Sequence, residues 1–267
     1  MARALEVHLL GPVQVVVDGQ VAGVDSARRR ALLAALALRP GTTLSVDALC
    51  EALWGEALPA NARGNLQSHV SRLRSQLGDG AIVLDHGGYR LDGGDGRTDV
   101  EEVERLAAEA QASRASDPAT AARLCGEALA RWRGPSLVEF ADHPAFLPDA
   151  TRLDELRRTL VDELHDARLD AGEAATTLPD IERTAASEPL RERSQILLMR
   201  ALHLCGRSAD ALRAGDAYRR RLVEETGLDP SGAVDELERE ILAGEAPAAP
   251  SPAPPPAAPA PPGPGTG

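Results

Sequence analysis

The stretch Asn61-Ala-Arg-Gly-Asn-Leu-Gln-Ser-His-Val-Ser-Arg-Leu-Arg-Ser-Gln-Leu77 decides how the N-terminal part of the chain folds. Its large apolar residues recur at spacings of four, three and four, which predicts an amphipathic helix with one narrow buried stripe, formed by Leu66, Val70, Leu73 and Leu77. The other residues are polar or small, and residues 61–78 include no Asp or Glu. A thin apolar anchor with a polar, acid-free outer face is what a DNA-recognition helix requires.

The polar side chains of this helix are our candidates for DNA contact. At about 100° per residue, Asn65, Ser68 and Arg72 lie on or beside the face opposite the apolar stripe. Arg pairs bidentately with guanine, Asn and Gln pair with adenine, and Arg and Ser suit phosphates. We therefore expect DNA contacts from Arg63, Asn65, Gln67, Ser68, His69, Ser71, Arg72 and Arg74. The alternative is a helix whose polar face is simply solvated.

The segments around this helix complete the pattern of a winged helix. Residues 5–9 alternate apolar and polar side chains, residues 13–17 are mostly β-branched, and Asp18-Gly19 is the dipeptide of a tight hairpin turn, so we expect strands over residues 5–24. Two helical patterns follow, one with Ser26 as its expected N-cap and one that begins near Ser45. Residues 82–91 predict a closing hairpin. Strands, three helices and a C-terminal hairpin together predict an α+β winged-helix domain.

The rest of the chain has a different pattern, which is helical throughout from residue 99 to about residue 242. Turn signals near Gly172 and Gly206 lie 34 residues apart, and Ala167 and Ala201 repeat at the same offset. A 34-residue helix–turn–helix period is typical of tetratricopeptide repeats. We therefore predict an all-α, tetratricopeptide-like helical repeat domain after the winged helix.

The charge is divided unevenly between the expected domains, which are residues 1–97, residues 98–243 and a disordered Pro/Ala-rich tail over residues 244–267. Residues 1–97 hold 10 Arg and 10 acidic residues, so this part has no net charge. Residues 98–267 hold 19 Arg and 31 acidic residues, which accounts for the whole net charge of −12. The acidic total therefore does not exclude binding of nucleic acid by the first domain.

The sequence contains no pattern typical of an enzyme or of a cofactor site. The three cysteines stand far apart, and the six histidines show no paired spacing for a metal. No glycine-rich phosphate loop occurs, and no nucleophile stands near a base. We expect neither catalysis nor a metal or other cofactor.

Cysteine usage and hydropathy indicate the cellular compartment in which the protein is expected. An odd and sparse set of cysteines fits a reducing environment. No cleavable apolar leader begins the chain, and no segment approaches the roughly 20 apolar residues that cross a bilayer. We expect a cytoplasmic, nucleoid-associated protein without membrane contact.

Several motifs resemble those of a known family. The OmpR-type winged helix is similar to Ala48-Leu-Cys-Glu-Ala-Leu-Trp-Gly55, to Asn65-Leu-Gln-Ser-His-Val-Ser-Arg-Leu-Arg74 and to Gly88-Tyr89. The Streptomyces antibiotic regulatory protein family adds a bacterial transcriptional activation domain of tetratricopeptide-like helices, and its motifs resemble Ala128-Leu-Ala-Arg-Trp-Arg-Gly-Pro135, Glu188-Pro-Leu-Arg-Glu-Arg193, Gly206-Arg207 and Glu225-Thr-Gly-Leu-Asp-Pro230. The ordered series resembles this family over about residues 3–243.

The resemblance implies a role in transcription. The helix 61–77 would enter the major groove of double-stranded DNA, with Ser68, Arg72 and Arg74 as the strongest groove candidates, and the hairpin would approach the minor groove. The loop that faces RNA polymerase holoenzyme would consist of Gly55, Glu56, Ala57, Leu58 and Pro59. Members of the family bind direct repeats upstream of secondary-metabolite promoters and recruit polymerase, so two molecules would bind side by side as a homodimer on DNA.

The hairpin departs from the resembled pattern. Leu84-Asp85 stands where this fold often carries Arg, and an Asp would be repelled by phosphates, so we expect hairpin contacts from His86 or Arg90 instead. Tyr89 is expected to be a core residue. The alternative function is a protein-interaction scaffold, in which the winged helix docks a protein and the helical repeats dock a peptide.

Overall fold

The computed structural model describes residues 4–92 and 98–244. The chain divides into two compact units, residues 1–173 and residues 174–267, which we take in turn. The expected domain boundary after residue 97 therefore falls inside the first unit. The predicted disordered tail, apart from Gly244, lies outside the described residues.

The first unit begins with an antiparallel sheet, as the alternating pattern predicts. β1 (Leu5–His8), β2 (Gln14–Val17) and β3 (Gln20–Ala22) pair in sequence order. Asp18 and Gly19 have φ values of 50° and 77°, and two consecutive left-handed residues are what a tight hairpin turn requires.

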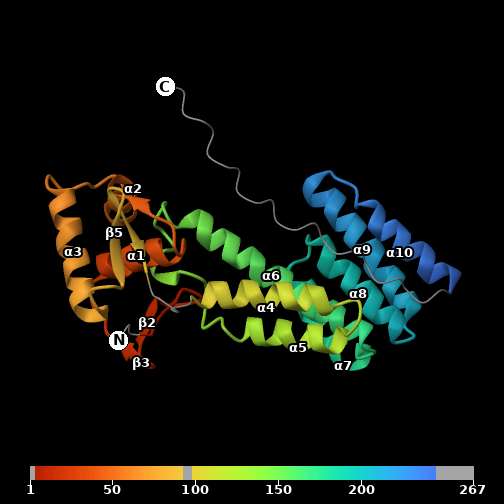
Figure 1. Ribbon diagram of the computed structural model, residues 1–267. Coiled ribbons are helices and arrows are strands. Elements are labelled where there is room, and N and C mark those ends of the chain that lie inside the picture. Colours follow the sequence, from red (N-terminus) through yellow and green to blue (C-terminus); the bar gives the residue numbers. More distant parts are fainter. Residues whose placement is uncertain (1–3, 93–97, 245–267) are drawn as a thin grey trace, which may run out of the picture. The chain divides into compact units, whose positions relative to one another are not determined.

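Three helices follow the sheet, and the third stands at the outer edge of its unit (Figure 1). They are α1 (Ala27–Ala37), α2 (Val46–Trp54) and α3 (Ala62–Leu77). Ser45 caps α2 by accepting a hydrogen bond from the Ala48 amide. Ser26 occupies the predicted N-cap position of α1, but its side chain forms no capping hydrogen bond.

The wing contains one strand more than the sequence predicts. β5 (Ile82–Asp85) and β6 (Gly88–Leu91) form the expected hairpin, and β4 (Leu44–Ser45) pairs with β6 on its other side. Two residues are too few to give a periodic signal, which is why the pattern missed this strand. Gly88 is required here, because a Cβ at that position would collide with the Leu44 carbonyl.

The remaining helices of this unit are α4 (Asp99–Ser113), α5 (Pro118–Leu129) and α6 (Leu147–Asp170). The expectation of helix throughout is wrong for the stretch between α5 and α6, which contains only the short 3-10 helix η1 (Val138–Phe140). Gly134 and Pro135 interrupt the helical pattern there. The stretch instead returns to the winged helix, where the Arg133 amide donates to Leu10 O at 2.8 Å and the Leu137 amide to Leu9 O at 3.1 Å.

A buried carboxylate joins α4 to the same two residues of the winged helix. Asp99 accepts hydrogen bonds from the Leu9 amide at 2.7 Å and the Leu10 amide at 3.0 Å. Burial raises the pKa of Asp99, although these two hydrogen bonds act in the opposite direction. Leu9, Leu10 and Leu137 belong to one hydrophobic core that runs from the strands into α6. The winged helix and the first helices of the second expected domain therefore share a core.

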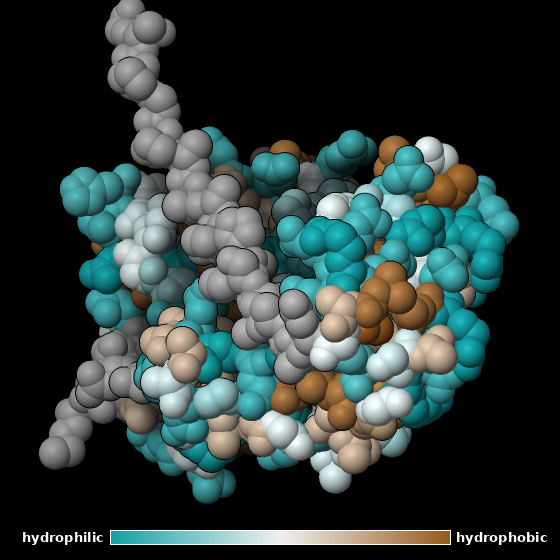
Figure 2. Space-filling view, turned by 90° about the vertical axis from the view of Figure 1, so that its right-hand side faces the viewer, coloured by the Kyte–Doolittle hydropathy of each residue, from teal (hydrophilic) through white to brown (hydrophobic). Residues whose placement is uncertain are grey.

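The second unit consists of four helices: α7 (Ala174–Ser187), α8 (Glu192–Leu204), α9 (Ser208–Thr226) and α10 (Gly232–Ala243). The face drawn in Figure 2 is mostly hydrophilic, with separate apolar patches. The large apolar residues that this unit leaves exposed are Leu190, Leu204, Val223, Leu228 and Leu242. No helix within residues 4–92 and 98–244 is long and apolar enough to cross a membrane.

The 34-residue period is visible in the backbone of two helix ends. Gly172 and Gly206 have φ values of 82° and 76°, and the amide of each donates to the carbonyl three residues earlier, at 3.0 Å and 2.8 Å. The next amide in each turn, of Glu173 and Arg207, donates five residues back. Such paired bonds around a left-handed glycine end helices in a fixed direction. The two turns are thus equivalent at the predicted offset.

Candidate nucleic-acid interface

The predicted division of α3 into a buried stripe and an exposed face is confirmed. Leu66, Val70, Leu73 and Leu77 are each no more than 2% exposed. The polar candidates that the structure leaves exposed on this helix are Arg63, Asn65, Gln67, Ser68, Ser71 and Arg72. The Asn61 side chain caps the helix by accepting from the Gly64 amide, so even the cap adds no negative charge. The exposed face of α3 therefore consists of neutral and positively charged side chains.

The three arginines of α3 have different surroundings. Arg72 is exposed and forms no ion pair with any residue that the structure describes. Arg63 lies 3.0 Å from Asp47, but both side chains are over 70% exposed, and such pairs contribute little. Arg74 is half-buried, and its Nε donates to Ile82 O at 2.7 Å. Arg74 thus joins α3 to the wing, whereas Arg72 and Arg63 are available to an outside anion.

His69 lies between α3 and the other helices rather than on the open face. Its ring centroid is 6.1 Å from that of Trp54 in α2. Burial lowers the pKa of His69, and the charges of Arg28, Arg29 and Arg72 lower it further. The imidazole is therefore neutral near pH 7, and it adds no positive charge to the interface.

The wing carries cations whose charge is largely offset. Asp85 accepts a hydrogen bond from Thr43 Oγ1 at 3.0 Å, which is the main reason that its pKa is lowered, and it lies 2.6 Å from Nδ1 of the exposed His86. Arg90 lies between Asp85 at 3.9 Å and Asp92 at 3.3 Å. Tyr89 is 6% exposed, which confirms it as a core residue.

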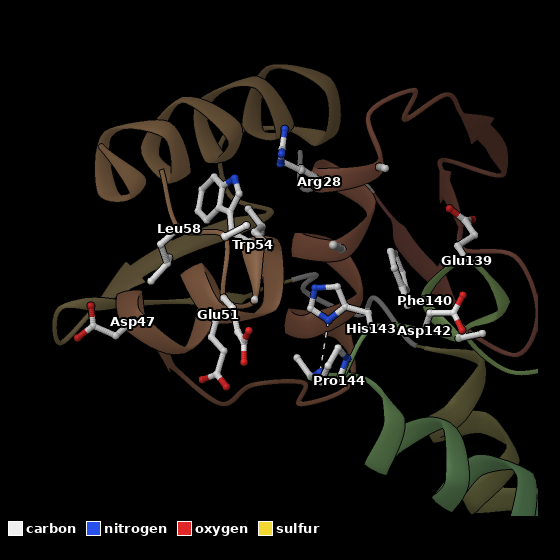
Figure 3. A pocket seen from close by; sticks show the side chains of 18 of the residues that line it. Arg28, Asp47, Glu51, Trp54, Leu58, Glu139, Phe140, Asp142, His143 and Pro144 are labelled. Atoms are coloured by element: carbon white, nitrogen blue, oxygen red, sulfur yellow. Dashed lines mark hydrogen bonds between the residues drawn. The ribbon is translucent and has the colours of Figure 1, made fainter. Parts of the chain in front are cut away.

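Gly55 to Leu58 of the predicted polymerase-facing loop form one side of a groove of about 1130 Å³. Residues 138–145, from the stretch between α5 and α6, form the other side. Figure 3 shows the Trp54 ring inside this groove and the carboxylates of Asp47, Glu51 and Asp142 around it. Leu58 in the loop is 57% exposed. The loop thus combines an exposed apolar side chain with acidic neighbours.

Sequence reasoning missed Arg28 and Arg29 at the start of α1. Arg28 lines the same groove as Trp54, whose ring centroid lies 6.1 Å from that of His69 in α3, and the charges of Arg28 and Arg29 contribute to the lowered pKa of His69, although more than 30 residues separate them from α3 in sequence. The available signal was a run of three arginines in a helix start with no acidic residue.

The structure offers little for covalent or metal chemistry in the part of the chain that it describes. No group of three or more His, Cys, Asp or Glu side chains in these residues could hold a metal ion. Burial raises the pKa of the Cys50 thiol and raises that of Cys125 to about 12. Both thiols are thus protonated and unreactive near pH 7.

Two family models match the chain. The model described as bacterial transcriptional activator domain matches residues 98–242, and the model described as transcriptional regulatory protein, C terminal, matches residues 25–91. The second match contains α1, α2, α3 and the wing.

Several curated relatives are transcriptional regulators. The regulatory protein AfsR of Streptomyces coelicolor is 38% identical over 91% of this chain, which spans about a quarter (24%) of AfsR. The regulatory protein DnrI of Streptomyces peucetius is 32% identical over 90% of this chain and 93% of its own length. The transcriptional regulator RedD of Streptomyces coelicolor is 31% identical over 90% of this chain and 71% of its own length.

One solved structure has the same architecture. Mycobacterium tuberculosis EmbR, in complex with a low affinity phosphopeptide, superposes with a TM-score of 0.85 and 31% identity, over 91% of this chain and 66% of that one. The likeness confirms the predicted combination of a winged helix with tetratricopeptide-like helices. The chain belongs to the Streptomyces antibiotic regulatory protein family of transcriptional regulators.

Proposed function

We propose that this chain activates transcription by sequence-specific binding of double-stranded DNA through α3. The observation that carries the proposal is the exposed, acid-free face of that helix in a chain of net charge −12. A surface that excludes carboxylates within an acidic protein suits a polyanionic partner.

The side chains of α3 take different roles in this proposal. Arg72, which is exposed and has no ion-pair partner among the described residues, reads a base edge in the major groove, together with Asn65, Gln67 and Ser68. Ser71 and Arg63 bind backbone phosphates. Arg74, which donates to Ile82 O, orients the wing against the helix. His86 and Arg90 of the wing make weaker contacts, because Asp85 and Asp92 offset their charge.

Contact with RNA polymerase holoenzyme completes the proposed mechanism. The loop of residues 55–59 supplies this contact, supported by the exposure of Leu58 beside the acidic groove. Binding to direct repeats would seat two molecules side by side on promoter DNA in the nucleoid. The regulated genes belong to a secondary-metabolite pathway in this proposal, and the protein itself catalyses no reaction.

Selection of duplexes from a random-sequence library by the full chain tests the proposal. Selected DNA should bind more tightly than random DNA, and both affinities should fall as salt rises because counterions are released. Arg72→Ala should weaken binding of the selected duplex by about 1–3 kcal/mol and relax its sequence preference. Arg105→Ala is the matched control, since Arg105 is engaged by Glu102 and Glu109 and should not affect binding.

Two results would contradict this proposal in different ways. A folded chain that enriches no sequence would exclude specific DNA binding and favour a protein-interaction scaffold. Wild-type affinity in Arg72→Ala would keep DNA binding but remove Arg72 from the reading face.

A further inference from the structure

A helix that lies in the major groove has a phosphate backbone on each side, because the groove is only about 12 Å wide. α3 correspondingly has two flanks. On one flank Arg74 contacts the wing through Ile82 O. On the other flank His69 contacts Trp54 of α2. Each flank needs its own cations if both strands are held.

Among the residues that the structure describes, the wing flank offers little unpaired positive charge. Arg90 lies between Asp85 and Asp92, and His86 lies against Asp85. Any phosphate that approached these side chains would compete with carboxylates already in place. The wing alone is therefore a weak clamp for the DNA backbone.

The opposite flank carries Arg28 and Arg29 from the start of α1. Arg28 lines the same groove as Trp54, whose ring centroid lies 6.1 Å from that of His69. Burial lowers the pKa of His69, and the charges of Arg28, Arg29 and Arg72 lower it further. Figure 3 shows Arg28 near Trp54 and away from the carboxylates of Glu139 and Asp142. The first turn of α1 contains no acidic residue.

These arginines are without ionic partners in the described ranges, residues 4–92 and 98–244. Arg30, the next residue, forms an ion pair with Glu139, but neither Arg28 nor Arg29 forms one. Two buried polar atoms at this place, Arg29 Nε and His69 Nδ1, also have no hydrogen-bond partner there. Ordered water can satisfy such buried atoms, so it is the exposed guanidinium of Arg28 that is open to an outside anion.

We propose that Arg28 and Arg29 bind a backbone phosphate of the DNA strand opposite the wing, beside the groove that α3 enters. The inference rests on the proposed DNA binding and adds the residues that hold the second strand. A guanidinium matches a phosphate with two parallel hydrogen bonds, and like-charged neighbours such as Arg28, Arg29 and Arg72 are stabilised when a shared anion arrives.

The salt dependence of binding to a short random-sequence duplex tests this inference with the full chain. Each phosphate contact contributes about 0.9 to the slope of log K against log salt. Arg28→Ala with Arg29→Ala should reduce the steepness of the slope by about one, the contribution of the one phosphate that both side chains bind, and should weaken binding roughly tenfold at low salt; Arg28→Ala alone should give part of this change. Sequence preference on the selected duplex should persist, because phosphates carry no base identity.

A matched control removes two arginines that the chain already pairs. Arg105→Ala with Arg123→Ala makes the same change of net charge, and Arg105 and Arg123 are bound by Glu109 and Glu127. This control should leave the slope unchanged. Arg28 is exposed, so Arg28→Lys and Arg28→Glu should both fold. Arg28→Lys should keep most of the wild-type slope, and Arg28→Glu should lose the part of the slope that Arg28 contributes.

The results separate this inference from the proposed function. A double variant that keeps both the wild-type slope and selective binding would remove Arg28 and Arg29 from the interface and leave α3 as the reading helix. A folded wild-type chain that binds no DNA would overturn both proposals. A slope that falls equally in the Arg105 and Arg123 control would show a net-charge effect and overturn the phosphate site.

Discussion

Arginine is used in opposite ways by α3 and α4. In α3 the first turn has no acidic residue, and Arg72 is exposed with no ion-pair partner in the described part of the chain. In α4 three acidic residues occupy the first turn, and Arg105 lies 2.8 Å from Glu102 and 2.5 Å from Glu109. One helix leaves its arginine for an outside anion, and the other neutralises it within the chain.

The caps of the two helices differ in the same direction. α3 begins with the neutral Asn61, which accepts from the Gly64 amide at 3.1 Å. α4 begins with a capping box, in which the Glu101 amide donates to Thr98 Oγ1 and the Thr98 amide donates to Glu101 Oε2, both at 3.0 Å. Both devices satisfy free backbone amides, but only that of α4 adds negative charge.

The comparison teaches that helix stability and DNA binding place different demands on the same positions. Acidic side chains near a helix start are stabilising, and α4 uses them fully. A helix that binds in a phosphate-lined groove, as we propose for α3, gives up that stabilisation and relies on its buried stripe and a neutral cap. Four predictions follow from this difference, in order of decreasing effect.

The largest effect should come from the structural carboxylate of α4. Asp99→Ala leaves the buried amides of Leu9 and Leu10 without their acceptor, so the free energy of unfolding should fall by about 3 kcal/mol, as measured by urea denaturation. Glu104→Ala, whose exposed carboxylate pairs with Arg152, is the control and should change it by less than about 1 kcal/mol. Equal effects of the two substitutions would contradict the buried role of Asp99.

A negative charge at the N-cap of α3, Asn61, should leave the free energy of unfolding unchanged but weaken DNA binding. Asn61→Ala should reduce the free energy of unfolding by about 1 kcal/mol, because the Gly64 amide loses its partner. Asn61→Asp should retain that stability, since Asp caps equally well, but should bind duplex DNA several-fold more weakly at low salt. Unchanged DNA affinity in Asn61→Asp would show that the start of α3 lies away from the phosphates.

A smaller, pH-dependent effect is expected from His69. Its pKa is lowered in the folded chain, first by burial and then by Arg28, Arg29 and Arg72, so the folded state favours the neutral imidazole. The resulting stability is present above the unfolded pKa of about 6.5 and is lost as the pH falls through the lower folded value. Urea denaturation between about pH 7.5 and pH 5.5 should show a smaller loss in His69→Gln than in the wild type; equal losses would contradict this assignment.

The smallest effect should come from the paired arginine of α4. Arg105→Ala removes exposed ion pairs with Glu102 and Glu109, so the free energy of unfolding should fall by only about 0.5 kcal/mol. DNA affinity, measured by fluorescence anisotropy, should not change. A tenfold loss of DNA affinity would mean that α4 also contacts DNA, which would contradict the proposed difference between α3 and α4.

Much of the first domain was predictable because its signals are local. Asp18-Gly19 specifies its turn through two left-handed residues, and Asn61 and the apolar stripe specify α3 through neighbours at most four residues away. The buried Tyr89 and the exposed Arg72 also follow from alternation and helical periodicity alone.

The misses share one cause, which is contact between distant parts of the chain. β4 exists only because Gly88 lets Leu44 approach, 44 positions away in sequence. The stretch between α5 and α6 is shaped by Leu9 and Leu10, more than 120 positions earlier. No periodicity within either segment carries that information.

The sequence by itself determined the succession of strands, three helices and hairpin in the first domain, the face of α3 that stays in water and the 34-residue repeat, because each depends on neighbouring residues along one helix, strand or turn. Only the tertiary structure decided that Asp99 closes the winged helix, that Asp85 and Asp92 offset the charge of Arg90, and that Arg28 and Arg29 stand beside His69. The physical reason is that hydrogen bonds and charges act across space, between residues that the chain brings together only when it has folded.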